Sequence, residues 1–347
     1  MRRLGFATLT LLLALLCLSC VRRPILDPED NALLKLSLVT SDINNVTCNI
    51  YNDKIPRPEL KSDKLRVFIY QAADNLQISQ GFVPNVGVDE NGNQLFSGAI
   101  ALSPGEYKML GYNFDIADTF IDGDDNYNTC RAYTYGVSES LYSRFGTRVS
   151  RSEKVFYQPE HVFVADESDI VVEPHIGEKV IYSYAHTIVD TYYIQIRISG
   201  QQHIAQKAAG LALLSGLSSS KLLADGTLSE EPCSLYFEMQ QSTDENIADE
   251  NKNVLCAVFN TFGRIDTAES KLKVTFSVLT RDGKTHQKEV DMESIFATED
   301  AQQRHWLIID EVWDIPEPIM PEGSGGFNPE VDEWEDVTEV IPIGPRE

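Results

Sequence analysis

Apolar and polar residues alternate along several short stretches of the chain. Residues 192–198 (YYIQIRI) have a tyrosine and then three isoleucines at every second position, and residues 271–278 (KLKVTFSV) repeat the pattern with Leu, Val and Phe. A period of two is typical of a β-strand with one buried face. Short apolar runs between turn-forming residues predict further strands. These are Leu65–Tyr70, Ala99–Leu102, Tyr107–Phe114, Val162–Val164, Ile170–Val172 and Trp306–Ile309.

One hairpin is specified by its turn residues. The strand at 271–278 leads to Asp282-Gly283, a dipeptide typical of a type I′ turn, so His286–Val290 is expected to return antiparallel to it. Helical patterns are confined to Gln201–Ser215 and Ser294–Gln303. Because helices do not alternate with strands, the pattern argues against a parallel α/β fold. It predicts an all-β protein made of antiparallel β-sandwiches.

The length of 347 residues suggests two domains. A boundary is expected near Pro174 and Gly177, which interrupt strand-like runs on both sides. We therefore predict an N-terminal β-sandwich domain at residues 20–178 and a C-terminal one at residues 179–315. An extended acidic C-terminal tail, residues 316–347, follows with a hinge rich in proline and glycine.

The N-terminus has the features of a lipoprotein signal peptide. Arg2 and Arg3 precede the apolar stretch Leu9–Leu18, which is too short to span a bilayer. Ser19 places a small residue directly before Cys20, as in the lipobox of a bacterial lipoprotein. Residues 1–19 are therefore predicted to be removed, and Cys20 is predicted to carry the lipid.

The same segment contains a Cys17-x-x-Cys20 spacing, and two other interpretations stay open. Cys17 stands where a lipobox usually has an aliphatic residue, so ordinary secretion with removal of both cysteines is one alternative. A thiol site is the other, although a zinc site would need a second cysteine pair. The later cysteines match no zinc spacing, and their disulfide state is left open. They are Cys48, Cys130, Cys233 and Cys256.

The net charge of the chain limits the classes of molecule that it is expected to bind. The chain has 53 Asp and Glu against 29 Lys and Arg, a formal net charge of −24. So acidic a chain repels phosphate backbones, which argues against nucleic-acid binding. It is also repelled by anionic lipid, so stable attachment to a membrane needs the covalent anchor at Cys20.

No standard catalytic constellation is present. The chain lacks G-x-S-x-G, H-E-x-x-H and phosphate-binding glycine loops, and its six histidines are scattered. The acidic run Asp122–Asn126 is followed by Tyr127 where an EF-hand needs glycine, so a solvated loop is expected and a different calcium site is the alternative. We predict no enzyme activity, no metal and no cofactor. Two carboxylates brought together only by folding would leave no trace in the sequence.

The tail contains more apolar side chains than a solvated acidic segment needs. Its Phe and Trp residues predict contact with another surface. The tail either folds back onto the second domain, or offers Val337–Ile343 as a strand to the sheet edge of another subunit, or stays disordered. The candidate partner-binding residues are Phe327, Trp334, Val337, Val340, Ile341 and Ile343.

Three segments together resemble the fimbrillin-like lipoprotein superfamily of Bacteroidales, in an uncharacterised branch. They are the lipobox ending at Cys20, the segment Leu102–Phe114 (LSPGEYKMLGYNF) and the segment 323–343 (GSGGFNPEVDEWEDVTEVIPI). The resemblance implies two transthyretin-like β-sandwich domains, palmitate or a similar acyl group on Cys20, and export to the cell outer membrane. It also implies assembly into a fimbrium (pilus), cell adhesion, and other fimbrial subunits as partners through strand addition.

In stalk subunits of that superfamily, a protease cuts after a basic residue and removes the lipidated N-terminal strand. Here Arg57 precedes Pro58, a poor protease target, and Arg66 lies inside a predicted strand; Lys61 and Lys64 remain candidates. The lack of a clear cleavage site implies a subunit that keeps its lipid. We therefore predict an anchor or accessory subunit, exposed on the cell surface.

The alternative function is that of a surface glycan-binding lipoprotein without catalytic activity. The chain has 14 tyrosines and 3 tryptophans, and exposed rings can stack on sugars. Tyr133 with Tyr135 and Tyr182 with Tyr184 are the candidate pairs, although ordinary strand residues fit the same pattern. The partner would then be a host or bacterial surface glycan.

Overall fold

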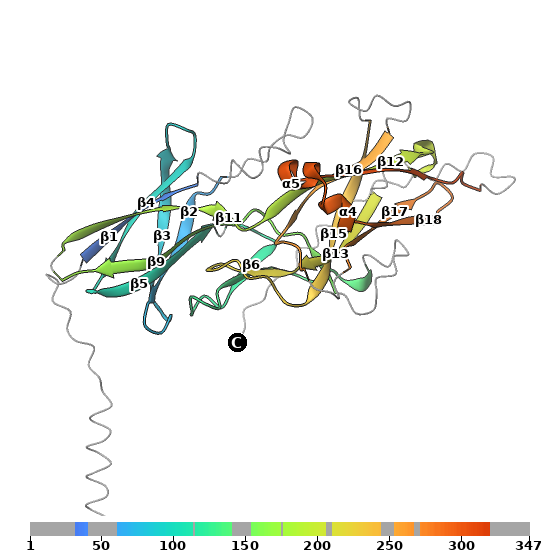
Figure 1. The fold of residues 1–347 in the computed structure, drawn as a ribbon. Helices are drawn as coiled ribbons and strands as arrows, with labels where there is room; N and C mark the ends of the chain where they lie inside the picture. Colours follow the sequence, from blue (N-terminus) through green and yellow to red (C-terminus); the bar gives the residue numbers. More distant parts are fainter. Residues whose placement is uncertain are drawn as a thin grey trace, which may run out of the picture.

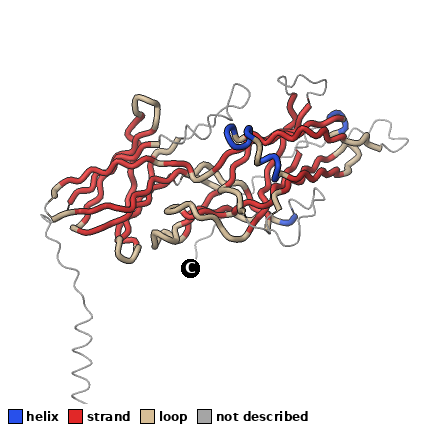
Figure 2. Tube along the Cα trace, in the orientation of Figure 1, coloured by secondary structure: helices blue, strands red, loops and turns tan. Residues whose placement is uncertain are grey.

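Strands dominate the architecture (Figures 1 and 2). The described helices are short, as in α4 (Glu293–Phe296), α5 (Glu299–Arg304) and the 3₁₀ turn η1 (Gln201–His203). The prediction of an all-β protein is confirmed. The computed structural model describes residues 32–40, 61–113, 115–140, 154–174, 176–205, 210–243, 253–266 and 271–319.

The first sheet holds eight strands in the order β10-β1-β4-β3-β2-β5-β9-β11. The two ends of this sheet come close together. Lys179 Nζ of the end strand β10 donates a hydrogen bond of 2.5 Å to Val171 O of β9, the strand next to the other end. Apolar side chains such as Leu36, Val67 and Phe96 fill its interior. The strands are β1 (Ala32–Val39), β2 (Lys64–Gln71), β3 (Gln77–Val88), β4 (Gln94–Leu102), β5 (Gly105–Asn113), β9 (Phe163–Val172), β10 (Glu178–Tyr184) and β11 (His186–Thr187).

The second sheet has the order β18-β17-β13-β15-β16-β12-β19, with β8 paired to β15. In its core the rings of Phe237 and Phe259 stack with centroids 4.5 Å apart, and α4 and α5 add Phe296 and Ala301. The strands are β8 (Val155–Tyr157), β12 (Asp190–Ser199), β13 (Gly210–Ser218), β15 (Pro232–Thr243), β16 (Asn253–Thr261), β17 (Lys273–Leu279), β18 (Thr285–Asp291) and β19 (Trp306–Asp314).

A three-stranded sheet, in the order β14-β7-β6, connects the two large sheets. Its strands are β6 (Thr119–Asp122), β7 (Arg131–Thr134) and β14 (Ser220–Leu222). Ala132 of β7 shares a buried cluster with Phe68 of the first sheet and Phe262, which follows β16. The two large sheets are therefore joined through a common apolar core, and β6 lies between them in Figure 1.

Most of the predicted strands are confirmed, including the hairpin. β17 and β18 pair antiparallel across the turn that contains Gly283, whose φ of 76° suits a residue without a Cβ. The run predicted at Ile170–Val172 and the last two residues of the run predicted at Val162–Val164 belong to the single strand β9.

The helix predicted at Gln201–Ser215 is wrong. After the 3₁₀ turn η1, the chain enters β13. Leu211 and Leu213 face one buried cluster, whereas Ala212 and Leu214 face the main core of the second sheet. A strand buried on both faces reads as a continuous apolar run, which periodicity does not distinguish from a helix.

The prediction of antiparallel sheets holds for most strand pairs but needs a correction, because both large sheets are mixed. Among the described strands, three pairings are parallel: β1 with β10, β12 with β19, and β8 with β15. The paired strands lie far apart in the chain, so no turn sequence between them predicts the pairing. β10 and β11, which begin at Glu178 and His186, pair in the first sheet. β8, at Val155–Tyr157, pairs in the second sheet. The predicted domain limits and the transthyretin-like topology stay predictions.

Candidate functional site

The N-terminal strand β1 is built into the first sheet on both sides. It pairs in parallel with β10 and antiparallel with β4 along its whole length. Leu34, Leu36 and Leu38 alternate with polar or exposed neighbours and are at most 1% exposed. Burying a leucine stabilises a fold by about 1.5–3 kcal/mol, so these three contribute on the order of 5 kcal/mol. β1 is therefore a core strand of this sheet.

Both ends of β1 are also fixed by hydrogen bonds. Leu33 N donates to Gly177 O at 2.8 Å, and Ala185 N donates to Val39 O at 2.7 Å. On the outer face, the Lys35 ammonium lies 2.7 Å from Glu178, the first residue of β10. Removal of β1 would leave unpaired backbone groups on β4 and β10 and open three leucine-sized spaces.

The basic residues that follow β1 differ in whether a protease could cut after them without damaging the first sheet. Arg66 lies inside β2, as predicted, and Lys64 is the first residue of that strand. Between Lys61 and Lys64, Ser62 is buried and donates to Asp115 Oδ1 at 3.0 Å. A cut at Lys64 or Arg66 would damage β2, whereas Lys61 is exposed and precedes it. Arg57 lies outside the described residues.

The outermost strands of the second sheet, β18 and β19, face each other, and within the described residues no backbone pairing joins them. The Lys288 ammonium of β18 pairs with the Glu311 carboxylate of β19. Asp310 and Glu311 lie where β19 shifts register against β12, between the pairs Ile309–Ile196 and Val312–Arg197. An irregular, charged edge hinders indiscriminate pairing with another sheet. The pair of edges is a candidate place for a specific added strand.

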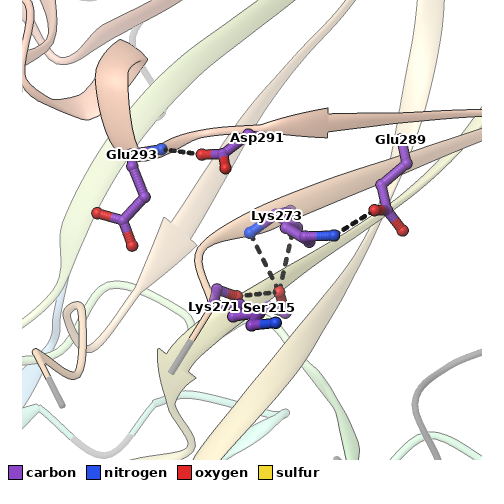
Figure 3. Close-up of polar contacts among 6 residues, drawn as sticks. All are labelled: Ser215, Lys271, Lys273, Glu289, Asp291 and Glu293. Carbon is purple, nitrogen blue, oxygen red and sulfur yellow. Dashed lines mark hydrogen bonds and ion pairs between the residues drawn. The ribbon is translucent and has the colours of Figure 1, made fainter. Parts of the chain in front are cut away.

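Polar contacts fix the start of β17 and the end of β18 (Figure 3). Ser215 Oγ donates to Lys271 O at 2.6 Å and accepts from Lys273 N at 3.1 Å. The Lys273 ammonium pairs with Glu289 of β18, and this pairing raises the pKa of Lys273. Asp291 Oδ1 accepts from the backbone N of the first residue of α4 at 2.9 Å. The edge strand β18 is thus held in one register.

The chain leaves the second sheet beside the β17–β18 turn. Ile315 N donates to Ser199 O at 3.0 Å, and Ile319 N donates to Asp282 Oδ2 at 3.2 Å. Thr280 Oγ1 also donates to Asp282, at 2.6 Å, and these hydrogen bonds hold the pKa of the Asp282 carboxyl well below its usual range. The tail predicted at residues 316–347 therefore starts close to one end of β18.

The predicted site residues themselves lie outside the described part of the chain. The lipidation and partner-binding predictions are untested for that reason and stay predictions. They concern Cys20, Phe327, Trp334, Val337, Val340, Ile341 and Ile343.

The two predicted tyrosine pairs lie on different sheets. Tyr182 and Tyr184 stand on β10 and are 70% and 63% exposed. The rings of Tyr133 and Tyr135 lie in a T-shaped arrangement with centroids 6.3 Å apart, and Phe120 of β6 contacts both. Phe120 was not predicted from the sequence, because the four residues of β6, Thr-Phe-Ile-Asp, show no alternation of apolar and polar positions.

Several groups owe their perturbed pKa values to burial in the packed interior. Burial raises the pKa of the Cys130 thiol to about 12, and this free thiol lies among aromatic rings that include Tyr70. A thiol of high pKa is a poor nucleophile. Burial also raises the pKa of Asp190 and lowers that of Lys221, while their mutual attraction opposes both shifts.

The acidic run Asp122–Asn126 is engaged by cations of the chain itself. Asp122 lies 3.0 Å from Arg131, and Asp124 lies 3.7 Å from Arg66. Within the described residues, no group of three or more His, Cys, Asp or Glu side chains is arranged to hold a metal ion. In the same residues, no helix has the length and apolar character needed to cross a membrane.

Known proteins match the chain along most of its length. A protein named "Putative fimbrium anchoring subunit Fim4B" from Bacteroides ovatus is 23% identical over 373 residues, which cover 96% of this chain and 97% of that protein. A crystal structure described as a putative adhesin from Bacteroides ovatus has a TM-score of 0.58 and 18% identity, covering 87% of this chain and 98% of its own. It shares the fold.

The fimbrial anchor protein Mfa2 from Porphyromonas gingivalis matches at a TM-score of 0.46 and 11% identity, covering 82% of this chain and 90% of its own. The resemblance to fimbrial proteins of Bacteroidales is confirmed by the anchoring-subunit relative from Bacteroides ovatus. The model of the family "Domain of unknown function (DUF5119)" matches residues 38–238, more than half of the chain. The chain therefore belongs to the DUF5119 family.

Proposed function

We propose that this protein is a fimbrial anchoring or accessory subunit that keeps its N-terminal strand and is held at the outer membrane by a lipid on Cys20. A relative named as a fimbrium anchoring subunit supports a fimbrial role. The proposal that the N-terminal strand is retained rests on the pairing of β1 with β4 on one side and with β10 on the other. Because a lipid on Cys20 is connected to the protein through β1, only a chain that keeps β1 stays attached.

The short connection to the lipid limits how far the first sheet can stand from the membrane. Residues 21–31 separate Cys20 from the start of β1 at Ala32. A fully extended chain spans at most about 3.6 Å per residue, so the linker reaches about 40 Å. The first sheet therefore lies near the membrane, and the second sheet, joined to it through the shared core, is directed toward the fibre.

The fibre partner is proposed to bind by strand addition at the second sheet. Backbone hydrogen bonds give such a contact its affinity, and alternate side chains give it register. Two elements suit this role and lie close together: the facing edges β18 and β19, and the tail that starts beside the β17–β18 turn. The tail residues proposed to contact the partner are Phe327, Trp334, Val337, Val340, Ile341 and Ile343.

The anchoring role is tested by deleting this protein in the bacterium that produces it. Fibres assembled without an anchor are expected in the culture medium, whereas the parent strain keeps them on its cells. Electron microscopy of cells and an immunoblot of the cell-free medium measure the two pools. Complementation with the intact protein provides the control, and fibres that stay on the deletion strain would contradict the role.

A further inference from the structure

The outward face of the three-stranded sheet carries an aromatic cluster. Antiparallel pairing sets Phe120 opposite Tyr133, and Asp122 opposite Arg131. Side chains alternate across a strand, so these four share one face, and Tyr135, two residues after Tyr133, extends it. The intervening residues face the buried core that joins the two large sheets. We call the outward set, Phe120, Asp122, Arg131, Tyr133 and Tyr135, the aromatic platform.

The rings of the platform hold one another in place. The Phe120 centroid lies 4.1 Å from that of Tyr135 and 5.7 Å from that of Tyr133. Tyr135 is 56% exposed, although an isolated ring gains free energy by burial. These ring contacts hold the two tyrosines in fixed positions, so the platform is preorganised for a ligand.

A charged pair borders the rings on the same face. Arg131 Nη2 lies 3.0 Å from Asp122 Oδ2, and the guanidinium carbon lies 5.9 Å from the Tyr133 centroid. Both charged side chains are about half exposed, at 51% and 49%. The guanidinium has five N–H donors and the carboxylate accepts at two oxygens, so the pair retains hydrogen-bonding capacity beyond its mutual contact.

We propose that the aromatic platform binds a neutral oligosaccharide. The negative face of an aromatic ring attracts the polarised C–H groups on one face of a sugar ring. The Arg131–Asp122 pair and the tyrosine hydroxyls then offer donors and acceptors for the sugar hydroxyls. The net charge of −24 and the acidic turn after β6 repel sulfated or uronate glycans. This binding is separate from anchoring and requires neither the lipid nor a fibre partner.

A glycan array tests the proposal with the mature full-length chain, using neutral gluco-, manno-, galacto- and N-acetylhexosamine oligosaccharides beside sulfated and uronate ones. At least one neutral series is expected to bind. Tyr135→Ala is expected to weaken that binding about tenfold or more, since it removes a stacking ring. Tyr135→Phe keeps the ring and is expected to retain most of the affinity.

Phe82→Ala provides the matched control, because Phe82 of β3 is an aromatic residue that is 57% exposed, about as much as Tyr135, and lies on another sheet. This variant is expected to bind like the wild type, and thermal unfolding of all variants checks that each is folded. The proposal is overturned if no neutral oligosaccharide binds, if only acidic ones bind, or if a folded Tyr135→Ala binds as the wild type does. A change of oligomeric state in Tyr135→Ala, without glycan binding by the wild type, would instead make the platform an interface between copies.

Discussion

Replacing Leu36 with aspartate is expected to prevent the first sheet from folding. Leu36 is 1% exposed and faces the interior between β4 and β10. An unpaired carboxylate in such a place costs several kcal/mol, which is comparable with the whole stability of a domain, about 5–15 kcal/mol. The milder Leu36→Ala is expected to lower the free energy of unfolding by about 2–5 kcal/mol. Denaturant titration followed by circular dichroism measures both variants.

The matched control lies on the same strand. Leu33 is 37% exposed, and its side chain points to the outer face, opposite to that of Leu36. Leu33→Asp is therefore expected to change the free energy of unfolding by only about 0.5 kcal/mol. If Leu36→Ala unfolded at the same denaturant concentration as the wild type, β1 would not be a core strand. The proposal that the anchoring subunit keeps β1 would then lose its main support.

Replacing Cys20 with serine is expected to release the protein from the membrane completely. Each buried methylene of an acyl chain contributes about 0.8 kcal/mol to membrane attachment, so a multiply acylated cysteine holds a protein almost permanently. A net charge of −24 gives the chain no electrostatic attraction to anionic lipid. The measurement is an immunoblot of membrane and soluble fractions from cells that express each variant.

Cys17→Ser is the control for this prediction. In the lipoprotein interpretation Cys17 is removed with the signal peptide, so its variant is expected to stay in the membrane fraction. If both serine variants released the protein equally, a joint role of the two thiols would explain the result better. If the wild type itself were soluble, ordinary secretion would be the correct interpretation of the N-terminus.

The sequence predicted the strands better than their partners. The alternation in 192–198 and 271–278 defined β12 and β17, because each has one face on the core of the second sheet. Partners joined by short turns, such as β17 and β18, follow from the turn residues. The parallel pairing of β1 with β10 brings together segments far apart in the chain, and nothing local encodes it.

The candidate surfaces were predictable only in part. Two tyrosines at i and i+2 were visible as a pair, because a strand puts such residues on one face. Phe120 and Arg131 join Tyr133 through strand pairing, and that register depends on how β6, β7 and β14 pack over the shared core. Sequence spacing carries no information on that packing.

The retained β1 strand is tested most directly by the intact mass and N-terminal sequence of the protein purified from its own membrane. We expect a mature chain that begins at Cys20, with a mass that includes acyl groups. A mature chain that begins shortly after Lys61 or Lys64 would contradict this account. It would mean that β1 is removed, that the sheet opens between β4 and β10, and that the protein polymerises as a stalk subunit.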